Sequence, residues 1–148
     1  MCGCLKIVQM VMFIPVLITL DKHRYSLAIR HFNKAIEKDP RNLKAFANRG
    51  EVNLLTGHFK SALVDYSTIL NLDPDSAEAY CGMAIAYEKL GQFADSLECY
   101  RKSIELDPSC AIPYHNKAEL KRKLGDLSFG EDRKRAADLG YPEKWVID

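Results

Sequence analysis

The sequence is poor in the residue patterns that enzymes and metalloproteins carry. Its four histidines are scattered along the chain, and none forms the paired spacing that holds a metal ion. No glycine-rich phosphate loop occurs, because the motifs LGQF and LGDL read as turns between helices. The many carboxylates fall on predicted helix surfaces and not in a catalytic arrangement. These absences predict a protein that is not an enzyme, with no cofactor and no metal site.

A strong net charge is also missing, since the formal charge of the 148 residues is only +1. The basic runs at residues 117–123 and 133–135 lack interleaved aromatic residues, so we expect no nucleic-acid partner. The balance conceals a division along the chain. Residues 21–60 carry nine Lys and Arg against four Asp and Glu, a net charge of +5, whereas residues 61–110 carry three against nine, a net charge of −6. Such blocks favour oriented, salt-sensitive contacts with a partner.

Cysteines are few and show no disulfide framework. There are five, an odd number, and the pair in Cys2-Gly3-Cys4 is too closely spaced for half of a zinc site. A reducing, cytoplasmic location is the simplest interpretation of this usage, with the cytoplasmic face of a membrane as the alternative.

The N-terminal stretch is apolar but too short to cross a membrane. Ile7 to Leu20 is fourteen residues with Gln9 and Pro15 inside it, whereas a membrane span needs about 20. The sequence TLDKHRY that overlaps its end offers no small-residue cleavage site for a signal peptidase. We therefore expect neither a signal peptide nor a transmembrane helix.

Three roles for residues 1–20 stay open. In the first, which we favour, they form an atypical first helix that packs on the helix after it. In the second, Cys2 and Cys4 are palmitoylated and the chain is a membrane-associated adaptor. In the third, the chain is a fragment of a larger repeat protein, or a truncated product whose true first helix is missing.

An internal period of 34 residues runs through the chain. It is marked by Pro40, Pro74, Pro108 and Pro142, and by Gly57, Gly91 and Gly125. The small residues that recur with it are Ala28, Ala62, Ser96 and Gly130, and then Ala35, Ser103 and Ala137. The aromatic residues that recur are Tyr25, Phe59 and Phe93, and then Phe32, Tyr66 and Tyr100. A fixed period of this length predicts stacked structural repeats.

Each period is typical of two antiparallel helices. In residues 79–109, one helical stripe is formed by Tyr80, Met83, Ala84 and Tyr87, and a second by Phe93, Ser96, Leu97, Tyr100 and Ile104. Gly91 lies between them, where a tight turn favours a residue without Cβ. Pro108 then ends the second helix. Ser76 and Ser109 are placed to cap the helices that follow.

The repeat length and the motifs YCGMAIAY, LGQF, FADSLECY and LDP resemble the tetratricopeptide repeat (TPR) family. The resemblance covers units 9–42, 43–76, 77–110 and 111–144, followed by a tail at 145–148. The middle two units match closely, the first matches only in its second helix, and the fourth has Gly130 and Lys134 where alanine and an aromatic are usual. The resemblance implies an all-α fold, a right-handed superhelical solenoid of antiparallel helix pairs over residues 21–144.

In that family the first helices of the units line a concave groove that holds a peptide or helix of a partner. The resemblance therefore implies a non-catalytic protein–protein interaction module, a scaffold or adaptor in an assembly. The groove positions that it implies are Lys44, Asn48, Glu51 and Leu55, then Glu78, Ile85, Glu88 and Lys89, and finally His115, Asn116, Glu119, Arg122 and Lys123. Apolar pockets are expected near Leu55 and Ile85, and a basic end near Arg122.

Some members of the family clamp the C-terminal carboxylates of heat-shock chaperones with cationic and Asn side chains on three successive first helices. Asn48 fits the middle position of that clamp. The flanking positions are Phe13 and Leu17 on one side and Glu78 and Gly82 on the other, which supply no cation for a carboxylate. We therefore do not expect chaperone tails as partners, and the identity of the partner stays open.

The register of the small residues can be tested by overpacking one of them. We expect Ala62→Leu to lower the free energy of unfolding by about 1–3 kcal/mol, because a larger side chain does not fit where helices approach closely. Thermal and urea unfolding followed by circular dichroism measure the change. An unaltered melting temperature would contradict the predicted register.

Overall fold

A computed structural model describes residues 22–142, and in this range the chain forms helices and no strand. The helices are α2 (Lys22–Lys38), α3 (Leu43–Leu55), α4 (Phe59–Leu72), α5 (Ala77–Lys89), α6 (Phe93–Leu106), α7 (Ala111–Lys123) and α8 (Phe129–Asp138). No helix of this range is long and apolar enough to cross a lipid bilayer. The predicted segment 1–20 with Cys2 and Cys4, and the tail 145–148, lie outside the described residues.

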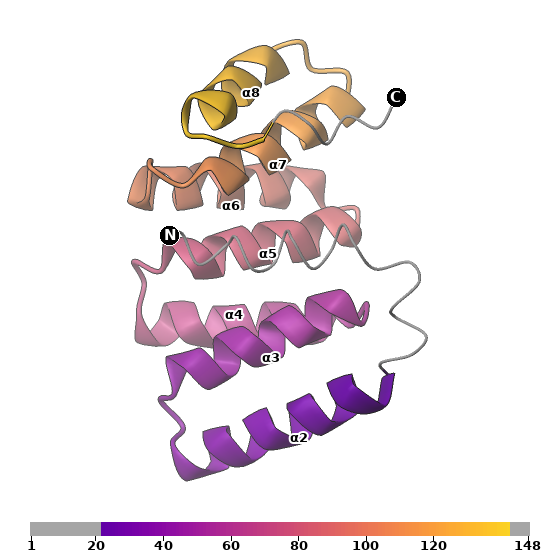
Figure 1. The fold of residues 1–148 in the computed structure, drawn as a ribbon, viewed down its shortest axis with the longest axis vertical. Coiled ribbons are helices and arrows are strands. Elements are labelled where there is room, and N and C mark those ends of the chain that lie inside the picture. The colour runs from indigo at the N-terminus through magenta and orange to yellow at the C-terminus, as the bar shows by residue number, and fades with distance from the viewer. Residues whose placement is uncertain (1–21, 143–148) are drawn as a thin grey trace.

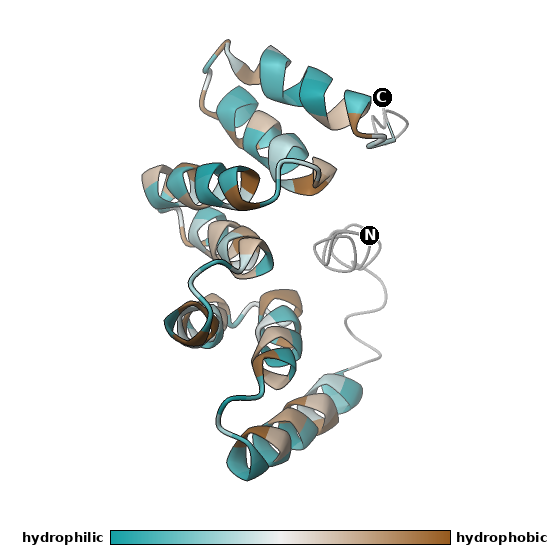
Figure 2. Ribbon diagram, turned by 90° about the vertical axis from the view of Figure 1, so that its left-hand side faces the viewer, coloured by the Kyte–Doolittle hydropathy of each residue, from teal (hydrophilic) through white to brown (hydrophobic). Residues whose placement is uncertain are grey.

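The helices stack one after another along a single axis (Figure 1). Helices α3 and α4, α5 and α6, and α7 and α8 form three pairs, and α2 precedes them. The second helix of each pair also contacts the first helix of the next, so that α2 packs on α3, α4 on α5, and α6 on α7. Seen from the side in Figure 2, the pairs rise in steps. The predicted all-α solenoid is confirmed.

The periodic glycines and prolines set the limits of the helices. Gly57, Gly91 and Gly125 have φ angles of +81°, +77° and +77°, a conformation that favours glycine and turns the chain back between the helices of each pair. Helices α2, α4 and α6 each end two residues before a periodic proline. The turn and the stop predicted from the period are therefore both present.

The small residues and the second aromatic row of the middle units lie in the core, whereas Phe93 of the first aromatic row is 41% exposed. Ala62, Ser96 and Tyr100 are completely buried. The ring of Tyr66, which is 1% exposed, lies against two glycines, because a Cβ atom added to Gly50 or Gly82 would stand 3.0 Å or 2.3 Å from its Cζ. Tyr66 on α4 thus fills the space between α3 and α5, and only residues without a side chain leave room for it.

The fourth unit departs from the predicted register. Helix α8 begins at Phe129, two residues later than the 34-residue spacing from Phe93 predicts. Gly130 is exposed, and a Cβ atom there would meet nothing within 4 Å, so its assignment to a close helix approach was wrong. Asp132 and Ala136 are the buried residues of α8 instead.

The predicted helix caps are half right. The Ser76 hydroxyl accepts a hydrogen bond from the Ala79 N–H at 3.3 Å and caps α5 as predicted. The residue before α7 is Cys110 and not Ser109. The Ser109 hydroxyl donates to the Asp107 carboxylate at 2.6 Å, which fixes the turn after α6 and leaves α7 without a side-chain cap.

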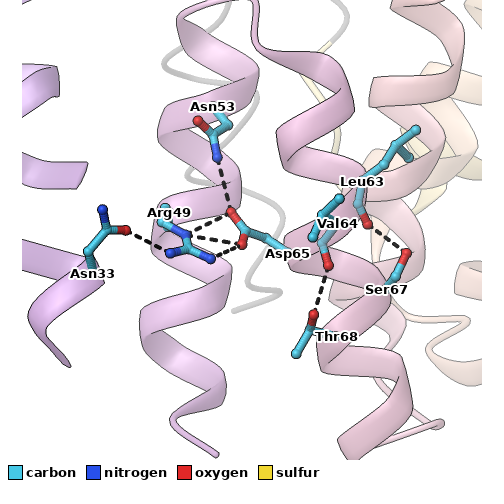
Figure 3. A network of polar contacts seen from close by, with 8 residues as sticks. All are labelled: Asn33, Arg49, Asn53, Leu63, Val64, Asp65, Ser67 and Thr68. Carbon is cyan, nitrogen blue, oxygen red and sulfur yellow. Dashed lines mark hydrogen bonds and ion pairs between the residues drawn. The ribbon is translucent and has the colours of Figure 1, made fainter. Parts of the chain in front are cut away.

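A buried carboxylate joins α2, α3 and α4 (Figure 3). The Arg49 guanidinium donates to both oxygens of Asp65, with Nη2 at 2.6 Å from Oδ1 and Nε at 3.2 Å from Oδ2. Asn53 donates to Asp65 Oδ2 at 3.0 Å, and Arg49 Nη1 donates to Asn33 Oδ1 at 2.7 Å. Because Asp65 is only 1% exposed, these partners replace the water that it loses on burial.

An ionic contact of the same kind holds α7 against α8. Lys117 Nζ lies 3.0 Å from Asp132 Oδ1, and Lys121 Nζ lies 2.7 Å from Oδ2. Lys117 and Lys121 follow Arg49 and Asn53 by two periods, so the first and last pairs carry cations or amides at the same two positions. Asp132 contacts both lysines only when it faces α7. This requirement explains which face of α8 packs inward.

The middle pair is held differently at these positions. The residues one period after Arg49, Asn53 and Asp65 are Met83, Tyr87 and Cys99, which pack into the hydrophobic core. Burial raises the pKa of the Cys99 thiol to about 11 and also raises the pKa of Tyr87. Both groups are therefore neutral at physiological pH, and this contact is apolar.

We expect Gly82→Ala to lower the free energy of unfolding by about 1–3 kcal/mol, because the added methyl group overlaps the buried Tyr66 ring. Gly130→Ala is the matched control, since it adds the same group to a helical glycine with open space around it. The control should be neutral or stabilise the protein by less than about 1 kcal/mol. Urea unfolding measures both, and equal effects would contradict the close packing at Tyr66.

We expect Asp65→Ala to cost about 3 kcal/mol, because it leaves the partly buried Arg49 without its carboxylate. Thr68→Ala on the same helix removes an exposed hydroxyl that donates to the Val64 carbonyl, and it should change stability by less than about 0.5 kcal/mol. Denaturant midpoints of the two variants give the comparison. A loss at Asp65 no larger than at Thr68 would show that the buried network does not stabilise the fold.

Candidate functional site

The first helices of the three pairs lie next to one another. Helix α3 contacts α5, and α5 is joined to α7 by an ion pair between Glu88 Oε1 and Lys123 Nζ at 2.9 Å. The thirteen residues predicted to line the groove all belong to these helices. We call them the first-helix surface.

The predicted residues differ in how far they reach solvent. The exposed ones are Lys44, Glu78, Lys89, Arg122 and Lys123. The partly buried ones are Asn48, Glu51, Glu88, His115, Asn116 and Glu119. Leu55 and Ile85 are buried, at 9% and 8% exposure, so their own side chains hardly reach solvent. The side chains that reach solvent most on this surface are charged.

A buried tyrosine anchors the junction of α5 and α7. The Tyr100 hydroxyl on α6 donates to Glu88 Oε2 at 3.3 Å, while the other Glu88 oxygen accepts from Lys123. Burial raises the pKa of Tyr100 well above its usual value, so the phenol keeps its proton and remains a donor. Three helices are thus linked through one carboxylate.

A second ion pair lies wholly on α7. Arg122 Nη2 lies 2.9 Å from Glu119 Oε2, and Nε of the same guanidinium lies 3.2 Å from it. The hydrogen bond from Arg122 lowers the pKa of Glu119, so this carboxylate is ionised at neutral pH. The basic end predicted near Arg122 is therefore partly neutralised by acidic side chains of the protein itself.

One aromatic contact on this surface was not predicted. The rings of His115 and Tyr141 stack with their centroids 4.0 Å apart and 15° between their planes. Burial lowers the pKa of His115, so its imidazole is neutral at physiological pH. The Tyr141 N–H donates to the Ala136 carbonyl at 2.9 Å, which returns the chain after α8. The only sequence signal for this was its place next to the periodic Pro142.

Three charged residues of the first-helix surface have no ion-pair partner in the part of the chain that the structure describes. They are Lys44 near the start of α3, Glu78 near the start of α5 and Lys89 at the end of α5, and all three are exposed. Lys44 and Glu78 are one period apart, so neighbouring helices present opposite charges at the same level. These groups can form ion pairs with a second molecule without breaking one within the protein.

The described repeats match family models in sequence and solved proteins in structure. A family model described as a tetratricopeptide repeat matches residues 77–110, and one described as a TPR repeat matches residues 56–91. The sequence matches no curated protein.

The solved structures that this chain is similar to include several of MamA. A double mutant of MamA RS-1 is 24% identical, with a TM-score of 0.71, and the match covers 83% of this chain and 68% of the MamA chain. MamA from Desulfovibrio magneticus RS-1, from residue 41 to its end, is 23% identical, with a TM-score of 0.72 over 83% and 69%. A further MamA structure is 21% identical, with a TM-score of 0.71 over 80% and 65%. At this level of identity the likeness concerns the fold.

The repeat models and the fold agree on how the helices are paired. Their matches, residues 56–110, cover α4, α5 and α6. They also include the turn before α4 with Gly57, the turn between α5 and α6 with Gly91, and the end of α6 before Pro108. The 34-residue period extends the same pairing of helices to α3, α7 and α8. Residues 56–110 therefore match tetratricopeptide repeat models, and the described helices on both sides continue the same pairing.

Proposed function

We propose that the protein is a non-catalytic interaction module whose first-helix surface binds a peptide or helix of a partner protein. Tetratricopeptide repeats mediate protein–protein interaction in general, and stacked repeats offer one extended surface. In such an assembly the module acts as a scaffold or adaptor.

The exposed charges of the first-helix surface carry this proposal. Lys44, Glu78 and Lys89 reach solvent from two neighbouring helices, and none is neutralised within the described residues. A partner segment that places an acidic group opposite Lys44 and a basic group opposite Glu78 gains two ion pairs, whereas the reversed segment meets two like charges. The surface therefore selects the direction in which the segment lies.

We expect a variant with Lys44→Glu, Glu78→Lys and Lys89→Glu to lose the partner that the wild-type chain retains. The matched control carries Lys60→Glu, Asp95→Lys and Lys102→Glu, which make the same reversals on the second helices α4 and α6. Full-length chains are used as bait in cell lysate, and retained proteins are identified by mass spectrometry. Circular dichroism first establishes that both variants are helical.

Support requires a protein that the wild type and the control retain and the first-helix variant loses, with the loss reproduced using the purified partner. Equal retention by all three chains would contradict the proposed surface. Equal loss in both variants would show that bulk charge, and not this surface, governs retention.

A further inference from the structure

Helix α2 presents an exposed basic face. Arg30, Lys34 and Lys38 follow one another at intervals of four residues, and His31 and Leu27 lie on the same side of the helix. All five are exposed, with Leu27 at 44%. Helical spacing places these residues opposite the apolar stripe of Tyr25, Ala28, Ile29, Phe32 and Ile36. We call them the basic face of α2.

No other second helix of the solenoid has this charge. Helix α2 contains five Lys and Arg and one Glu, a net charge of +4. Helix α6 has exposed cations too, but Arg101 pairs with both Glu98 and Glu105 on its own helix. Helix α8 contains three basic and three acidic residues and is neutral in sum. Arg30, Lys34 and Lys38, in contrast, form no ion pair with any described residue.

This arrangement is unfavourable for the isolated helix. Residues four apart on a helix are neighbours, so Arg30 repels Lys34, and Lys34 repels Lys38. On an anionic surface lying along the helix, each of the three cations would be attracted to negative groups, and this attraction would offset their mutual repulsion. No described residue forms an ion pair that offsets this repulsion, which is the pattern expected of a face that meets an external partner.

We propose that the basic face of α2 lies on an anionic lipid surface. In a bilayer interface, Leu27 would face the headgroup and acyl boundary while the cations contact phosphate and carboxylate headgroups. The apolar run from Ile7 to Leu20 ends two residues before α2 begins, so a second membrane-binding signal lies next to the first along the chain. Weak apolar and electrostatic signals together give stable membrane binding where either alone does not.

A lipid surface suits these residues better than the other anionic macromolecules. Single-stranded nucleic acid needs aromatic side chains for base stacking, and the exposed basic face has none. An acidic peptide would satisfy the cations but would leave the neighbouring apolar run without a role. This inference draws on α2 and on the sequence of the apolar run before it, and it does not rest on the first-helix surface.

The test is flotation of the full-length chain with vesicles of phosphatidylcholine alone and with vesicles containing about 30% phosphatidylserine, the charge of a cytoplasmic leaflet. The test variant carries Arg30→Gln, Lys34→Gln and Lys38→Gln. The control carries Arg133→Gln, Lys134→Gln and Arg135→Gln, which remove three exposed charges from the other end of the solenoid. A third chain with Arg30→Lys, Lys34→Arg and Lys38→Arg keeps the charge.

We expect the wild type to bind the phosphatidylserine vesicles and the α2 variant to bind them at least tenfold more weakly, because each basic residue near such a surface adds to the attraction. The control and the charge-keeping chain should stay within about twofold of the wild type. Binding should also fall as salt rises from about 0.1 to 1 M, which shortens the screening length from about 10 to about 3 Å.

Several results would overturn the proposal. Absence of wild-type binding would do so, and so would equal losses in the α2 variant and the control, which would indicate bulk charge. If the α2 variant still bound both kinds of vesicle, the membrane binding would be assigned to the apolar segment alone. A further contrary result is a wild type that is retained by polyglutamate or DNA and not by vesicles. If the α2 variant then lost this retention, the basic face would be assigned to another partner.

Discussion

The close approach of α3 and α5 around one buried ring is the constraint on which the rest of the structure depends. Tyr66 lies between Gly50 and Gly82, where even a methyl group would overlap it. This contact sets how closely α3 and α5 lie to each other. The first helices therefore lie side by side, and Lys44 and Glu78 are presented on neighbouring helices as parts of one surface.

The repeat architecture could be predicted from sequence because it depends on spacing. Glycines with positive φ recur every 34 residues, and Ala62 and Ser96 are buried where the period places them. The prediction failed where one carboxylate overrides the period. Asp132 turns α8 toward two lysines and leaves Gly130 exposed, and Asp107 takes the Ser109 hydroxyl that was assigned to a cap. Such local competition leaves no periodic signal.

The sequence predicted which residues lie on the first helices, but not how far each side chain is buried or paired. Leu55 and Ile85 belong to the first-helix surface in sequence, yet packing covers both of them. Glu88 is held by Tyr100 and Lys123 from two other helices, and contacts between residues so far apart in sequence follow only from the three-dimensional fold. Sequence gives the charge of a side chain, whereas its availability depends on its neighbours.

The alternation of ionic and apolar contacts within the pairs has a consequence for how the solenoid comes apart. Repeat proteins behave as a one-dimensional row of units, each coupled only to its neighbours. Here Asp65 and Asp132 hold the outer pairs through charge, while Met83, Tyr87 and Cys99 hold the middle pair by burial. Removal of either carboxylate would therefore loosen an outer pair while the centre keeps its packing. Amide hydrogens of α5 and α6 would then be the last to exchange with solvent.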